Sequence, residues 1–282
     1  MRISHNISAM NTYRQYNANA IATNKSMEKL SSGSRINRAA DDAAGLSISE
    51  KMRSQIRGLT QATRNAQDGI SFLQTAEGAL NEVSDMLVRL KELSVQVQNG
   101  TYSAEDKANI GAEMKALGTA ITGIYVNTKF NGIAVFGTQS GTDTLAVNDG
   151  TAEAASIAYG EDGNQKVSIK AAATTNLNAL TTLTAAADTA PDAVAVTTVE
   201  AAITEVNTTR ATYGALQNQL EHASNNMATT KENLQAAESR VRDVDMAEEM
   251  MEYTKNNILL QAAQSMLAQA NAQPQGVLQL LR

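Results

Sequence analysis

Two long apolar stripes constrain the fold of this chain more than any other feature of its sequence. They run from Met52 to Val97 and from Val199 to Val244, where mostly apolar residues recur at alternating intervals of four and three positions, with one slip in each stripe. Such spacing predicts a helix with an apolar stripe along one side. Each stripe covers roughly seven heptads, so each helix would extend roughly 70–80 Å at about 1.5 Å per residue. The simplest arrangement packs the two helices antiparallel against each other.

Short sequence signals mark the two ends of the first helix. Asp41 and Asp42 precede the first stripe, where carboxylates favour the positive end of the helix dipole, and Asn99-Gly100 follows it. A catalytic carboxylate pair is the alternative interpretation of Asp41 and Asp42. No histidine, nucleophile or metal-binding motif accompanies them, so helix capping is favoured.

Two further helix starts carry the pattern of a capping box, in which a hydroxyl residue is followed three positions later by an acidic one. Ser103 and Asp106 predict a helix that continues to about Thr128. Thr197 and Glu200 predict the start of the long C-terminal helix.

The middle of the chain, residues 131–192, lacks helical periodicity and is rich in Gly, Thr, Asp and Ala. Asn131-Gly132 is a turn signal, because both residues tolerate the left-handed backbone of a tight hairpin. The short strand candidates that follow are residues 133–136, 145–147, 156–159 and 167–170. The sequence therefore predicts a small β-hairpin region with exposed loops.

Composition excludes several classes of function. The 282 residues have a formal net charge of −6, which argues against nucleic acid as a partner, because phosphate binding favours a basic face. Cysteine is absent and the only histidines are His5 and His222, so no disulfide, iron–sulfur cluster, metal site or cofactor is expected. The N-terminus lacks a continuous apolar segment, and the chain has no apolar run long enough to cross a membrane. Neither a cleaved secretory signal nor membrane insertion is therefore expected.

Both ends of the chain are almost free of charge. Arg2 and Arg14 are the only charged residues before Lys25, and none occurs from Asn256 to Leu281, a segment rich in Asn and Gln. Amides are costly in lipid, and an isolated soluble helix normally has a charged face. Such ends suit burial inside a protein assembly, where Asn and Gln bond across subunits. Outside the assembly they are expected to be disordered, because lone helices are marginally stable in water.

Several stretches, in order and at matching distances from both termini, point to one family. They are residues 30–46 (LSSGSRINRAADDAAGL), 69–80 (GISFLQTAEGAL), 130–132 (FNG), 267–271 (LAQAN), 273–275 (QPQ) and 277–282 (VLQLLR). Together they resemble bacterial flagellin over about the first 136 and the last 85 residues. The middle matches no outer domain of that family, which indicates a short form with a reduced outer region.

The resemblance implies a mainly α fold: a long antiparallel, coiled-coil-like helical rod with paired terminal helices, and the small β-hairpin region in the middle. The implied divisions are residues 1–44 for an N-terminal inner-core helix and spoke, 45–136 for rod helices and the start of the β-hairpin, 137–192 for a short variable surface region of strands and loops, 193–244 for the C-terminal rod helix and 245–282 for the C-terminal inner-core helix.

The resemblance also implies a function. The chain would be a structural subunit of the bacterial flagellar filament and not an enzyme, with a hook–filament junction protein as the alternative. Members of the family leave the cell unfolded through the flagellar type III export apparatus, so the chain would be secreted and located in the flagellum. The implied partners are copies of itself, an export chaperone, the filament cap and hook-junction proteins, and the flagellin-sensing Toll-like receptor of a host. A cytosolic coiled-coil scaffold is a further alternative, but charged ends would be expected of it.

Two sets of residues are expected to make these contacts. Receptor binding is expected at Arg89, Leu90, Leu93, Gln96 and Glu113, with charged contacts from Arg89 and Glu113 and apolar area from Leu93. Val88 departs from the glutamine that is frequent at its position in the family. Polymerisation is expected to bury Ile3, Ile7, Met10, Ile21, Leu30, Ile258, Leu260, Leu267, Val277 and Leu280.

Overall fold

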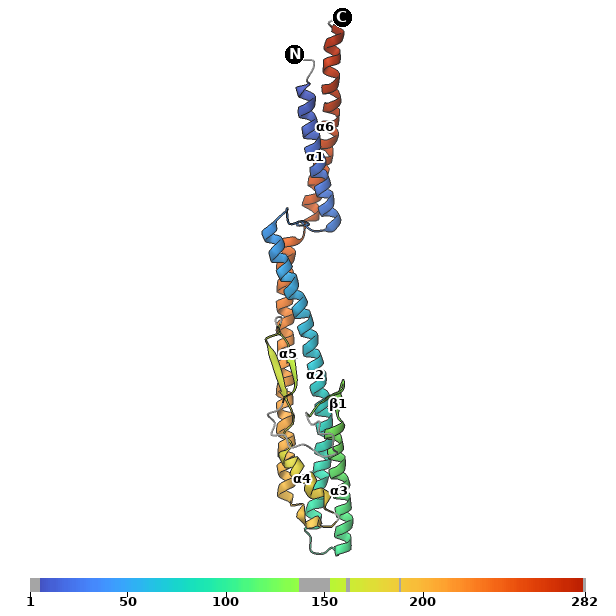
Figure 1. Cartoon of the computed structure of the whole chain (residues 1–282), viewed down its shortest axis with the longest axis vertical. Coiled ribbons are helices and arrows are strands. Elements are labelled where there is room, and N and C mark those ends of the chain that lie inside the picture. Colours follow the sequence, from blue (N-terminus) through green and yellow to red (C-terminus); the bar gives the residue numbers. More distant parts are fainter. Residues whose placement is uncertain (1–5, 137–152, 161–162, 188, 281–282) are drawn as a thin grey trace. The chain divides into compact units, whose positions relative to one another are not determined.

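The computed structural model describes residues 6–136, 153–160, 163–187 and 189–280, with side chains described through residue 273 (Figure 1). The described elements are α1 (Ile7–Ser32), α2 (Ala43–Val97), α3 (Ala104–Asn127), β1 (Lys129–Phe130), β2 (Ile133–Ala134), β3 (Glu153–Ala158), β4 (Lys166–Lys170), α4 (Thr175–Ala185), the short 3-10 helix η1 (Pro191–Ala193), α5 (Val196–Arg242) and α6 (Met246–Leu280). The expected mainly α fold with a small hairpin region is confirmed.

The chain divides into two compact units. The terminal unit contains residues 1–56 and 232–282, and the central unit contains residues 57–231. Helices α2 and α5 contribute residues to both. The two units differ in burial: the central unit encloses large apolar side chains, whereas α1 and α6 of the terminal unit expose many of theirs.

The two apolar stripes form the core of the central unit. Its buried stripe residues are Leu59, Ala66, Leu73, Leu80, Val83, Leu87, Leu90 and Val97 on α2, and Val199, Val206, Tyr213, Leu220 and Met227 on α5. Gln217 Nε2 donates to Glu77 Oε2 at 3.2 Å, and Lys91 Nζ lies 2.9 Å from Glu200 Oε1. The later position on α2 thus contacts the earlier position on α5. The two helices therefore run antiparallel here, as the stripes predicted.

Helix α3 begins at the predicted capping box. Ser103 Oγ accepts from the backbone N–H of Asp106, and the Asp106 carboxylate accepts from the backbone N–H of Ser103, each at 3.2 Å. Two of the unpaired N–H groups at the start of the helix are satisfied in this way.

Helix α4 was not anticipated, because residues 137–192 were expected to form strands and loops. It packs against α3, and the absence of a side chain at Gly118 makes room for Thr184. The Glu205 carboxylate on α5 accepts the backbone N–H groups of Thr175, Asn176 and Leu177 at 2.9–3.0 Å. Helix α4 is rich in Thr and Asn, which have modest helix propensity. Its helical conformation therefore depends on these tertiary contacts.

The strands form two antiparallel hairpins. Strands β1 and β2 pair across Asn131-Gly132, whose φ values of 49° and 81° fit the tight turn that the sequence predicted. Strands β3 and β4 pair with Ser156 opposite Ser168 and contain most of the predicted segments 156–159 and 167–170. The predicted segment 133–136 is a strand only at Ile133–Ala134, and segment 145–147 lies outside the described residues.

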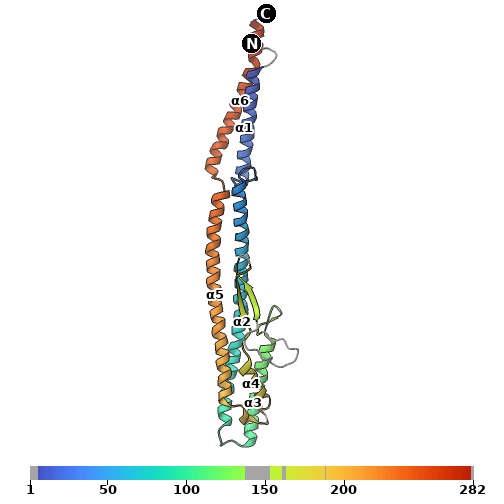
Figure 2. The ribbon, with the colours of Figure 1, turned by 60° about the vertical axis from the view of Figure 1, so that its left-hand side comes forward.

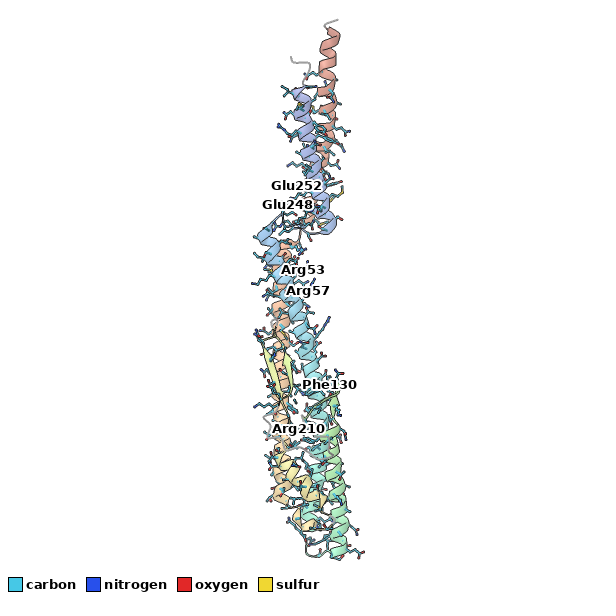
Figure 3. All side chains as sticks on the ribbon, viewed as in Figure 1. Arg53, Arg57, Phe130, Arg210, Glu248 and Glu252 are labelled. Atoms are coloured by element: carbon cyan, nitrogen blue, oxygen red, sulfur yellow. The ribbon has the colours of Figure 1, made fainter. Side chains whose placement is uncertain are left out.

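The terminal unit pairs α1 with α6, as expected, and the two helices lie side by side in both views (Figures 1 and 2). Asn6 Nδ2 donates to the carbonyl of Ala270 at 2.8 Å, and Lys29 Nζ lies 3.1 Å from Glu249 Oε2. These contacts make the pair antiparallel. In the same unit, α2 and α5 are also antiparallel, since Arg53 (labelled in Figure 3) lies 3.9 Å from Glu238 and Arg242 lies 2.7 Å from Glu50.

Two helix boundaries differ from the predictions. Helix α5 begins at Val196, so Thr197 lies inside the helix and is not its cap. The backbone N–H groups of Thr198 and Val199 already bond to the carbonyl of Ala195, which starts the helix two residues earlier than the Thr197–Glu200 pattern suggested. Helix α2 ends at Val97, two residues before Asn99. Among the described residues, none of the helices combines the length and apolarity needed to cross a membrane.

Candidate assembly surface

Helices α1 and α6 expose an unusual number of large apolar side chains. We call this set the terminal apolar surface: Ile7, Met10, Tyr13, Ile21 and Met27 on α1, and Met246, Met250, Met251, Ile258, Leu259 and Met266 on α6. Ile7 is 72% exposed and Ile258 is 61% exposed. Many exposed large apolar side chains on one pair of helices are typical of a site that another protein covers.

The interior of the α1–α6 pair contains little that could hold it together alone. The buried residues of α1 are Thr23 and Ser26, both polar. The described residues of α6 that are buried are Glu249, Asn256 and Ala270. Burial of large apolar side chains is the main favourable term in folding, and here most of those side chains face outward. The pair is therefore organised for burial against something outside the single chain.

Most of the residues expected to mediate polymerisation lie on this pair. Ile7, Met10, Ile21 and Ile258 are exposed, and Leu30, Leu260 and Leu267 are partly buried. Ile3 lies outside the described residues, and the side chains of Val277 and Leu280 do as well, although both positions belong to α6. Tyr13, Met27 and Leu259 were not among the residues predicted for polymerisation. The methionines of α6 were not among them either, although their helical spacing predicts a packing role.

Apart from Arg14, the charged residues of α1 and α6 lie at one end of the pair. Glu248 and Glu252, labelled in Figure 3, lie in the first turns of α6, and no charged residue follows Lys255 until Arg282. Glu249 is buried and pairs with the partly buried Lys29, and the Oε1 atom of Glu249 has no hydrogen-bond partner among the described residues. Loss of Lys29 would leave the buried Glu249 carboxylate unpaired, which is costly, so this ion pair favours the observed register of α1 against α6.

The segment between α1 and α2 is held by Asp41 and Asp42. Asp41 lies 2.8 Å from Lys25 Nζ and accepts the backbone N–H groups of Asn37 and Arg38. The hydrogen bond from Lys25 and those from the backbone lower the pKa of Asp41 to about 2. Asp42 Oδ1 accepts the backbone N–H of Gly45 at 2.9 Å, which confirms the predicted cap of α2. Both carboxylates therefore stabilise the chain between α1 and α2 and the start of α2.

The expected receptor segment lies in the central unit, on α2 and α3. Arg89 bonds to Glu113 on α3 at 2.9 Å and to Glu92 at 3.1 Å, and Gln96 Nε2 lies 3.2 Å from the hydroxyl of Tyr102. The hydrogen bond that Arg89 donates to the Glu113 carboxylate raises the pKa of Arg89, so its charge is secure. The structure thus brings Arg89 and Glu113 together on an exposed face, with Gln96 two turns along α2.

The structure corrects the role expected of Leu90 and Leu93. Leu93 is 1% exposed and Leu90 is fully buried, so neither offers apolar area to a partner. Both face the core of the central unit, and Leu90 already belonged to the predicted apolar stripe. Val88 and Val95 are instead about half exposed, at 49% and 54%, and are the apolar side chains on the outer face of this segment.

Comparison with known proteins places these features in a family. The family profile described as the bacterial flagellin N-terminal helical region matches residues 3–142, and that of the bacterial flagellin C-terminal helical region matches residues 196–281. The chain is 49% identical to a flagellin of Bacillus subtilis (strain 168), with all of both chains covered. The chain belongs to the bacterial flagellin family. The two profiles together include every helix of the terminal unit and all of α2, α3 and α5.

Further comparisons agree with this assignment. A flagellar filament 33 kDa core protein of Treponema phagedenis is 45% identical to this flagellin, again over all of both chains. A solved structure described as a flagellar hook-associated protein from Vibrio parahaemolyticus is 15% identical, with a TM-score of 0.59, over 72% of this chain and all of that one. At that identity the likeness concerns the fold alone. This flagellin is a structural subunit of the bacterial flagellar filament, and the hook-junction alternative has no better support.

Proposed function

We propose that this flagellin joins the filament by burying the terminal apolar surface against the same surface of neighbouring copies. The single observation that carries the proposal is the contrast within α1 and α6, whose interior positions hold Thr23, Ser26 and Asn256 while Ile7, Ile21 and Ile258 face outward. Burial of those side chains offsets the entropy lost when the helices become ordered. The amides that replace charges along α6 then bond between subunits.

Two outward isoleucines provide the test. Ile21→Asn with Ile258→Asn removes apolar area that lies outside the fold of the single chain, so the monomer should keep its helical content. Each fully buried apolar side chain contributes about 1.5–3 kcal/mol, so the double variant should raise the critical concentration for seeded polymerisation roughly a hundredfold. Electron microscopy and sedimentation of seeded samples measure this.

A control uses two apolar side chains of the central unit that are about half exposed. Val88→Asn with Val95→Asn changes the same kind of surface without touching α1 or α6. Removal of residues 256–282 is the more severe variant, and it should leave the central unit folded and unable to polymerise. Normal filaments from either the isoleucine variant or the truncation would refute the proposal.

We further propose that the chain is secreted unfolded through the flagellar type III export apparatus, with α6 held by an export chaperone beforehand and with the filament cap and hook-junction proteins as neighbours afterwards. The weak interior of the α1–α6 pair supports this, because such helices separate readily. The chain should be absent from the medium of cells that lack the export apparatus. If cells without the export apparatus released as much of the chain into the medium as cells that have it, the proposed export route would be wrong.

A second role is proposed for the exposed face of α2 and α3. Arg89, Glu113 and Gln96 are suited to contact the flagellin-sensing Toll-like receptor, while buried Leu90 and Leu93 support that face from the core. Arg89→Ala with Glu113→Ala should weaken receptor binding about tenfold or more, since a charged anchor commonly contributes more than about 1 kcal/mol. Lys107→Ala with Asp192→Ala removes a surface ion pair elsewhere in the central unit and serves as the control. Equal binding by the two variants would exclude this placement.

A further inference from the structure

The methionines of this chain are distributed unevenly between the two units. Six of the eleven are exposed, and all six lie on α1 or α6: Met10, Met27, Met246, Met250, Met251 and Met266. Met114 and Met227 in the central unit are buried, Met52 and Met86 are partly buried, and Met1 lies outside the described residues. Methionine thus accounts for more than half of the residues in the terminal apolar surface.

The register of the helix pair groups four of these methionines at two levels. Asn6 lies opposite Ala270, so Met10 and Met266, each four residues inward from that contact, lie at the same level. Lys29 lies opposite Glu249. Met27 lies two residues before Lys29 and Met251 two residues after Glu249, so in this antiparallel pair they also lie at one level. Met246 and Met250 are four residues apart on α6, close to the second level. A chemical change in methionine would therefore alter the terminal apolar surface at both levels.

An exposed thioether has a specific reactivity. Hydrogen peroxide transfers one oxygen atom to the sulfur, the O–O bond breaks, and the other oxygen leaves as water. The sulfur loses two electrons and becomes a sulfoxide, while the peroxide is reduced. The product is polar and accepts hydrogen bonds, so burying it without a donor is unfavourable.

We propose that the exposed methionines of α1 and α6 form an oxidation-sensitive site, at which sulfoxide formation in the free subunit blocks its polymerisation. The inference rests on the proposed burial of the terminal apolar surface in the filament. The same burial shields the thioethers once the subunit has been added. The free subunit is therefore the vulnerable form, and methionine sulfoxide reductases can restore it, because each sulfoxide is reversible.

The test begins with purified monomer treated with hydrogen peroxide and mapped by peptide mass spectrometry. Sulfoxides should appear first at the six exposed positions and last at Met114 and Met227. The critical concentration of the oxidised monomer in seeded polymerisation should rise about tenfold or more. Treatment with methionine sulfoxide reductases A and B should return it to the starting value. Assembled filaments given the same peroxide should show little sulfoxide at the six positions.

A variant with all six residues changed to leucine is the matched control, because leucine keeps similar volume and has no sulfur. It should polymerise before and after peroxide treatment alike. Unaltered assembly of wild-type monomer that carries sulfoxides at the six positions would overturn the proposal, as would equal inhibition of the leucine variant. Site mapping and reductase rescue remain decisive even if that variant folds poorly. The isoleucine variants test burial separately, since their failure to polymerise involves no oxidant.

Discussion

Two glycines of the central unit have open space around them and differ in backbone conformation. Neither Gly78 in α2 nor Gly132 in the β1–β2 turn has a neighbouring atom within 4 Å of where a Cβ would lie. Gly132 has a φ of 81°, a left-handed conformation that strains any residue with a Cβ, whereas Gly78 lies within a regular helix. A Cβ would meet no crowding at either position, so a comparison of the two alanine variants isolates the contribution of backbone conformation to stability.

Alanine at the two positions should therefore have opposite effects on stability. Gly132→Ala should lower the free energy of unfolding of the central unit by about 1–2 kcal/mol, through left-handed strain alone. Gly78→Ala should raise it by roughly 0.5–1 kcal/mol, because alanine is the better helix former. Urea denaturation followed by circular dichroism measures both changes. A stabilising Gly132→Ala substitution would show that the turn does not hold its left-handed geometry in solution.

Helix α4 illustrates how one distant side chain can support a whole element. Glu205 lies about thirty residues from the N–H groups that it accepts, yet it satisfies three of them at the start of α4. Glu205→Ala should lower the free energy of unfolding by about 1–3 kcal/mol, since hydrogen bonds to a charged group are lost. Glu200→Ala, one and a half turns earlier on α5, removes only the exposed pair with Lys91 and should cost less than about 1 kcal/mol. Equal losses in the two variants would contradict the role given to Glu205.

The same element shows where prediction from sequence ends. The stripes that build α2 and α5 were predictable because their periodicity repeats over many turns, and the Ser103 cap was predictable because its partners are three residues apart. Helix α4 has no such local signal, and its support comes from α3 and from Glu205. At the candidate receptor face, the stripe already indicated that Leu90 is buried. The resemblance that named Leu93 carried no information about which way its side chain points.

At the scale of the whole chain, the two units should differ in local stability because they bury different kinds of side chain. The central unit encloses Leu73, Leu80 and Tyr213, while the inward positions of α1 are Thr23 and Ser26. Regions with few buried apolar contacts open at low free-energy cost and exchange their amide hydrogens quickly. In dilute monomer, amides of α1 and α6 should therefore exchange much faster than those of α3 and of the central parts of α2 and α5.

After polymerisation the two terminal helices should become protected, with little change in the central unit. Hydrogen exchange read by mass spectrometry on both forms measures this, and Ile21→Asn with Ile258→Asn gives a non-polymerising reference. Strong protection of α1 and α6 in monomer at concentrations too low for association would mean that the pair is stable by itself despite its polar interior, and would contradict this prediction.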